Sequence, residues 1–162
     1  MRIAVLPVLL VSAALASGCG NDKASHHEAK TACAGEGIVV SDAWVRAAPA
    51  GRPMSAGYLT LCNGGETTAA LTGALFGGAA NVELHASSLD ENGVASMTPL
   101  ASLPVPVGGE ASMAPGGAHI MLIGLTAPLE AGETVEMTLE FENAPPQTVS
   151  FEVRDAAPGG HH

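Results

Sequence analysis

The residues of this chain with the clearest chemical potential are two imidazoles and two thioethers within one 37-residue stretch: His85, Met97, His119 and Met121. Thioether sulfur is a soft ligand that binds Cu(I) well and binds Zn(II), Mg(II) or Ca(II) poorly, whereas imidazole binds copper in either oxidation state. A set of two histidines and two methionines therefore favours copper, mainly as Cu(I). None of the four positions is a cysteine, so the set lacks the thiolate of a blue-copper redox centre and argues against electron transfer.

Isolated histidines and methionines in strands are more often packing or surface residues than metal ligands. That alternative applies to each of the four residues taken singly. The chain holds six His and six Met in all, and four of these twelve fall in the one stretch. This concentration favours their joint interpretation as a metal site.

Three short segments are expected to position the four side chains. Residues 118–123 are apolar and rich in branched side chains, which predicts a strand, and strand alternation places His119 and Met121 on one face. Residues 82–85 predict a second strand that ends at its histidine. Residues 94–97 predict a third, beyond an Asp-Glu-Asn-Gly turn signal. Three neighbouring strands would bring the four ligands together.

The spacing of the four residues resembles a known family signature. Eleven residues separate His85 from Met97, twenty-one separate Met97 from His119, and one separates His119 from Met121. This pattern is similar to that of the periplasmic CuA-type copper chaperone family, PCuAC. Many relatives carry an optional methionine directly after the first histidine, where this chain has Ala86. The similarity runs from about residue 38 to residue 153 and is carried by these segments: 42–47, 57–61, 82–85, 115–122 and 125 onward.

The resemblance implies a fold, a cargo and partners. That family has a cupredoxin-like β-sandwich and delivers Cu(I) to the binuclear CuA centre of cytochrome c oxidase subunit II. A thioredoxin-like periplasmic reductant would keep the cysteines of the acceptor reduced. Neutral imidazole and thioether ligands suit such a task, since a chaperone must hold copper and also release it. For this chain these properties are expectations.

Composition also predicts an all-β domain. The chain has 162 residues, of which 47% are hydrophobic and 3% aromatic, with 20 Gly and 11 Pro, which is enough for one core with many turns. The sequence shows no convincing amphipathic helix, internal repeat or second domain. Short branched or alternating runs predict strands at residues 38–47, 57–62, 69–76, 82–85, 94–100, 119–125, 135–141 and 149–153. A single β-sandwich or barrel over residues 36–155 is therefore expected.

The amino-terminal segment predicts export and lipidation. Residues 1–18 have the basic start and apolar run of a secretory signal, and the run is too short to span a bilayer. Residues 15–19 resemble a bacterial lipobox, so lipidation of Cys19 is expected, with ordinary cleavage nearby as the alternative. Residues 19–35 would form a polar tether, and residues 156–162 a short tail. These features predict a periplasmic or cell-envelope protein held to the membrane by a lipid anchor only.

The two remaining cysteines are expected to form a disulfide. Cys33 and Cys62 make an even pair in a chain that is expected to reach an oxidising compartment. An antiparallel hairpin of residues 38–47 and 57–62 would bring them near each other. Copper binding or disulfide exchange by these thiols is the weaker alternative, because the chain has no Cys-x-x-Cys motif.

The charge and the motif inventory exclude several classes of function. The formal net charge of −10 makes nucleic-acid binding very unfavourable. The acidic surface favours solubility, although it could also concentrate metal ions or steer docking. No catalytic constellation or phosphate loop is recognisable, so the chain is not expected to be an enzyme. A periplasmic copper buffer or store, and a non-metal scaffolding lipoprotein, remain as alternatives to a chaperone.

Other histidines and methionines are weaker candidates. Two adjacent pairs near the ends of the chain could take Cu(II) or Zn(II) weakly or have no role: His26 with His27, and His161 with His162. Met137 alternates with apolar residues and is expected on a core face. Met54 and Met113 have no histidine at useful spacing, so all three methionines are interpreted as packing or loop residues.

Overall fold

The computed structural model describes residue 33, residues 35–89 and residues 94–155. The expected signal peptide, the lipidation residue Cys19, most of the tether, the tail and both adjacent histidine pairs lie outside the described residues, as does the turn expected at residues 90–93. No helix in the described part of the chain has the length and apolar character needed to cross a bilayer.

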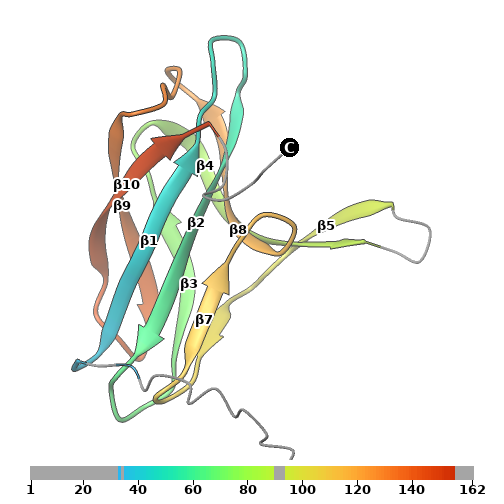
Figure 1. Ribbon diagram of the computed structural model, residues 1–162. Helices are drawn as coiled ribbons and strands as arrows, with labels where there is room; N and C mark the ends of the chain where they lie inside the picture. Colours follow the sequence, from blue (N-terminus) through green and yellow to red (C-terminus); the bar gives the residue numbers. More distant parts are fainter. Residues whose placement is uncertain (1–32, 34, 90–93, 156–162) are drawn as a thin grey trace, which may run out of the picture. The chain divides into compact units, whose positions relative to one another are not determined.

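The described residues form β-strands, as predicted, in one sheet. The strands are β1 (Ile38–Arg46), β2 (Met54–Asn63), β3 (Ala69–Leu75), β4 (Ala79–Leu89), β5 (Ala95–Pro99), β6 (Leu103–Val105), β7 (Glu110–Met113), β8 (Ala118–Leu125), β9 (Thr134–Glu142) and β10 (Gln147–Arg154). Their order in the sheet is β5-β4-β8-β2-β1-β10-β9-β3-β6, and β7 pairs with the second half of β2. Figure 1 shows β1, β2, β9 and β10 side by side, while β5 and the end of β4 with which it pairs project away from the rest of the sheet.

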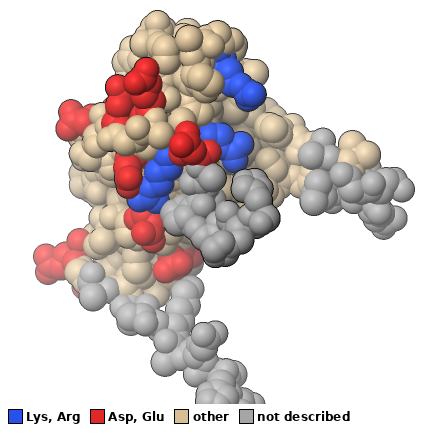
Figure 2. Space-filling view, turned by 45° about the horizontal axis from the view of Figure 1, so that its top comes forward, with Lys and Arg blue, Asp and Glu red and all other residues tan. Residues whose placement is uncertain are grey.

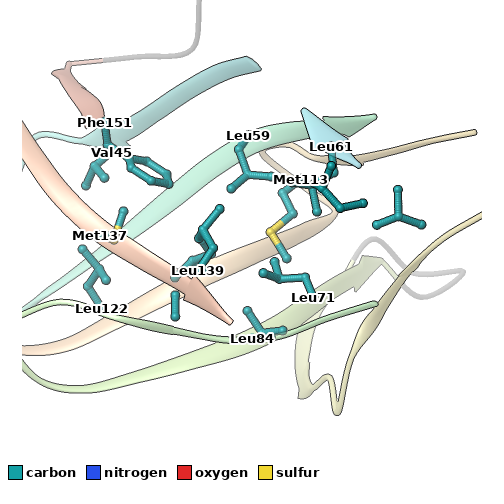
Figure 3. Packing of buried hydrophobic residues seen from close by; sticks show 14 of the residues in the cluster. Val45, Leu59, Leu61, Leu71, Leu84, Met113, Leu122, Met137, Leu139 and Phe151 are labelled. Carbon is teal, nitrogen blue, oxygen red and sulfur yellow. The ribbon is translucent and has the colours of Figure 1, made fainter. Parts of the chain in front are cut away.

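The sheet encloses one hydrophobic core. Strands that are distant in the sheet order contribute to a single buried cluster, for example Leu59 of β2, Leu71 of β3 and Phe151 of β10. Figure 3 shows these side chains pointing into a common interior. The sheet therefore curls over on itself as a sandwich, because a flat sheet could not bring these strands to one interior. Met113 and Met137 belong to this core, as expected for packing residues.

An irregularity in β1 determines which of its side chains point into the core and which point to the opposite face. The pairing of β1 with β2 shifts between Ser41 and Trp44, and Asp42 has a positive φ of 50°. Such a bulge reverses the inward and outward alternation of a strand. Val45 consequently points into the core, and Trp44 lies beside Tyr58 on the opposite face.

Cys33 and Cys62 form a disulfide with their Cα atoms 5.4 Å apart. The β1–β2 hairpin pairs Val39 with Cys62, so the segment that enters β1 passes next to the end of β2. This is the antiparallel arrangement that the sequence predicted for the two cysteines.

One expectation about local structure was wrong, and two short strands were not predicted. β4 does not end at His85 but continues to Leu89, because β5 pairs with it along that extension. The short strands β6 and β7 were not predicted: β6 has three residues, including Pro104, and it forms by pairing with β3. Pairing with a distant strand stabilises such segments, and the local sequence does not reveal that pairing.

Candidate metal site

Strand pairing brings the four predicted ligands onto one face of the sheet. His85 of β4 lies directly opposite His119 of β8, and residues paired in this way point to the same side. Met121 follows two residues after His119 on the same face. On the other side of β4, Met97 of β5 pairs with Ser87, which shares the face of His85.

His119 is oriented by a backbone carbonyl. Its side chain is 5% exposed, and its Nδ1 lies 3.1 Å from the carbonyl oxygen of Gly117. A carbonyl oxygen can only accept a hydrogen bond, so Nδ1 carries the hydrogen in this arrangement and Nε2 keeps its lone pair. Histidines that bind metal ions commonly use their second nitrogen in this way, which fixes the tautomer.

His85 shows the complementary arrangement. Its Nε2 lies 2.8 Å from Oε2 of Glu83, which identifies Nε2 as the donor to the carboxylate. Its Nδ1 is buried, and it is the one such side-chain nitrogen or oxygen in the described residues that has no hydrogen-bond partner. Leaving a buried polar atom unpaired costs about 1–3 kcal/mol. A metal ion at Nδ1 would satisfy it.

The two imidazoles lie close enough to share one ion. Their ring centroids are 5.9 Å apart, and the ring planes are at 74°. Metal–nitrogen bonds to imidazole are about 2.0 Å long, so a separation of this size is compatible with both rings binding a single ion. Within the described residues, no group of three or more His, Cys, Asp or Glu could hold a metal ion. The two thioethers are the further donors that the sequence predicts for a site here.

Both predicted methionine ligands are accessible at an open depression of about 420 Å³. Met97 is 60% exposed, while Met121 is half-buried. His119 lines the same depression, whereas His85 is not among its lining residues. The full lining is Arg46, Arg52, Met54, Ser55, Ala56, Tyr58, Ser87, Met97, Pro115, Gly116, His119 and Met121.

Met54 lies at this depression as well, which corrects its interpretation as a packing or loop residue. It begins β2, is 51% exposed, and shares the face of Ala56, which pairs with Met121. The alternation of Met54 with Tyr58 in β2 was visible in the sequence. Only the pairing of β2 with β8 shows that this face is the one that carries His119.

Two aromatic rings connect the site to β1. The Tyr58 ring centroid is 6.4 Å from that of His119, and the Trp44 centroid is 4.5 Å from that of Tyr58. Trp44 and Tyr58 are the only tryptophan and the only tyrosine in the chain. Each is therefore a specific spectroscopic reporter for this face.

We expect the Tyr58 phenol to ionise at a higher pH in the folded protein than in the unfolded chain. Burial raises its pKa above the usual value of 10.0, and the positive charge of Arg46 partly opposes this. Since the folded pKa is the higher one, this group's contribution to stability is complete below pH 10 and is lost as the pH rises through the folded pKa. Tyrosinate absorbance during an alkaline titration measures the shift, and Arg46→Gln should raise the midpoint further. A folded midpoint at or below that of the denatured chain would contradict this.

The fold and the site define a class: a small all-β sandwich that carries a histidine–methionine cluster on the outer face of its sheet. The chain belongs to the family described as "Putative lipoprotein LpqE-like", which it matches over residues 38–153. It is 40% identical over 121 residues to "Putative lipoprotein Lxx21020" of Leifsonia xyli subsp. xyli, covering 74% of this chain and 71% of that protein.

Solved structures share the fold. The copper-bound PCuAC domain from PmoF2 superposes with a TM-score of 0.62 at 24% identity, over 74% of this chain and 93% of that domain. Apo-DR1885 from Deinococcus radiodurans gives a TM-score of 0.57 at 27% identity, over 98% and 100%. The Cu(I) form of DR1885 gives 0.57 at 29% identity, over 79% and 86%. The predicted cupredoxin-like sandwich is thereby confirmed.

Proposed function

We propose that this protein is an exported, lipid-anchored copper chaperone that binds one Cu(I) ion through two imidazoles and two thioethers: His85 Nδ1, His119 Nε2, Met97 Sδ and Met121 Sδ. The observation that carries the proposal is the buried, unpartnered Nδ1 of His85 beside the ring of His119. Lipidation at Cys19 is part of the proposal, and the lipoprotein names of its family and relative support it.

The donor set determines what the site can do. Two neutral imidazoles and two neutral thioethers leave the bound ion with its single positive charge, and soft sulfur favours Cu(I) over Cu(II) or Zn(II). Hydrogen bonds from His85 to Glu83 and from His119 to Gly117 hold the rings in position before copper arrives. Thiolates of an acceptor bind Cu(I) more strongly than these ligands do. Copper can therefore pass to such an acceptor by stepwise ligand exchange, without a change in oxidation state.

The accessible thioethers suit delivery to another protein. Met97 is exposed on the projecting β4–β5 hairpin, while His119 is buried. An incoming ligand can displace the exposed thioether first, while the buried imidazole still holds the ion. We propose the CuA centre of cytochrome c oxidase subunit II as the acceptor, with a thioredoxin-like reductant that keeps its cysteines reduced. The copper-bound PmoF2 domain and Cu(I)-DR1885 among the structural neighbours support copper as the cargo.

Titration of the apo protein with Cu(I) is expected to give one tight equivalent, with quenching of the Trp44 fluorescence. The quenching follows from the short chain of rings from Trp44 through Tyr58 to His119. The affinity is measured by competition with a chromophoric chelator under reducing conditions, and Zn(II) is the matched control, which should bind much more weakly. If no stoichiometric Cu(I) site is found, the alternative of a non-metal scaffolding lipoprotein would be favoured.

Mixing the Cu(I)-loaded protein with the reduced, soluble CuA domain of the oxidase separates a chaperone from a copper buffer. A chaperone should transfer copper faster than the ion dissociates into a chelator solution, because transfer proceeds through a complex of the two proteins. A rate equal to that of simple dissociation would favour the buffer.

A further inference from the structure

The positive charges of the described domain are few, and two of them lie at the depression. The described residues include three cationic side chains, Arg46, Arg52 and Arg154, against twelve Asp and Glu. Figure 2 shows these few arginines among more numerous acidic residues. Arg46 and Arg52 both line the depression with His119 and Met121.

These two arginines also differ from the third in their partners. Arg154 donates to Glu152 at 2.6 Å and 2.9 Å. Arg46 and Arg52 are exposed, and neither forms an ion pair with a described residue. Glu83, a carboxylate on the face of the site, accepts instead from His85. Two positive charges that form no ion pair with any described residue therefore border the proposed copper site.

These charges do not favour copper binding. Cu(I) held by four neutral ligands keeps its positive charge, and like charges repel, so Arg46 and Arg52 weaken the retention of the ion slightly. Arg46 and Arg52 line the same depression as Tyr58 and His119, so both charges lie near the proposed ligands. A pair of cations that opposes the cargo is best explained by a second, anionic binding partner.

We propose that Arg46 and Arg52 dock the copper-exchange partner, and that this partner is a protein that surrounds its copper ligands with carboxylates. This inference rests on the proposed copper function. An acidic partner is repelled by most of the acidic surface of this chain and attracted at the depression, so only the orientation that joins the two copper sites is favoured. The exposed Met54 and Met97 supply apolar contact at the same place.

Two synthetic acceptor peptides test the proposal. They share one Cys-x-x-x-Cys segment and differ only in flanking residues, Glu in one and Lys in the other. Each thiol releases a proton as its sulfur replaces a ligand of the protein, and copper stays Cu(I). Recovery of the Trp44 fluorescence in stopped-flow follows the transfer. We expect transfer to the Glu peptide to be about 10-fold faster at low ionic strength, with the preference fading as salt screens the charges.

The double variant Arg46→Gln with Arg52→Gln should lose the preference for the Glu peptide and keep or slightly raise its Cu(I) affinity. Arg154→Gln is the matched control and should transfer copper as the wild type does. Equal rates to the two peptides in the wild type, or a preference that survives the double variant, would overturn the inference.

A measurement on the apo protein separates this inference from the copper function. In an NMR titration of the apo protein, the Glu peptide should shift the Nε–H signals of Arg46 and Arg52, and the Lys peptide should not. Unchanged arginine signals would reject the docking surface even where Cu(I) binds tightly. Shifted signals in a protein without a Cu(I) site would uphold the docking surface and reject the copper function.

Discussion

Replacing both thioethers, as Met97→Leu with Met121→Leu, is expected to lower the Cu(I) affinity by about 100-fold or more. Changes to groups that only support a metal ligand cost about 10- to 100-fold, so loss of two direct ligands should cost at least as much. Leucine conserves the volume of methionine and usually costs less than about 1.5 kcal/mol of stability. Met97 is 60% exposed, so its packing role is small. Competition with a chromophoric Cu(I) chelator gives the affinity, and thermal unfolding checks the fold.

Met54→Leu is the matched control for this double variant. Met54 is another exposed thioether at the same depression, but it lies outside the proposed ligand set. Its replacement should leave the affinity within about threefold of the wild-type value. An equal loss in the control, or an unchanged affinity in the Met97/Met121 double variant, would contradict the assignment of ligands.

Removing the disulfide, as Cys33→Ala with Cys62→Ala, is expected to lower the free energy of unfolding by about 3–4 kcal/mol. The bond closes a loop with a sequence separation of 29 residues, and the chain-entropy model gives this magnitude for such a loop. Chemical denaturation of the wild type and the variant measures the difference. A loss below about 1 kcal/mol would show that the bond adds little to the stability of the native domain.

Copper binding should survive that change. Cys62 lies at the end of β2 that pairs with β7, whereas the end of β2 near Ala56 pairs with β8 and borders the site. The variant is therefore expected to keep its Cu(I) affinity at temperatures where it remains folded. A weakened affinity in the folded variant would revive the alternative that these cysteines take part in copper chemistry.

Local patterns in the sequence predicted much of the architecture. Alternation and branched side chains located β1, β3, β9 and β10 to within a few residues, since a strand with one buried face repeats every two residues. The disulfide followed from the antiparallel hairpin that β1 and β2 form. The two short strands β6 and β7 were not predicted, because they form through hydrogen bonds to strands that are distant in the sequence.

The sequence by itself also named the candidate ligands, because thioethers and imidazoles grouped in one stretch favour copper and their spacing resembles a family signature. It determined that His119 and Met121 share a face, since alternation is a local property. The tertiary structure decided that His85 faces His119, which nitrogen of each ring is hydrogen-bonded, and that Met54, Arg46 and Arg52 lie at the same depression. The physical reason is that these facts depend on register between strands far apart in the chain. Register arises from the packing of the whole sheet around its core, and a slip of one residue would move every side chain of a strand to the other face.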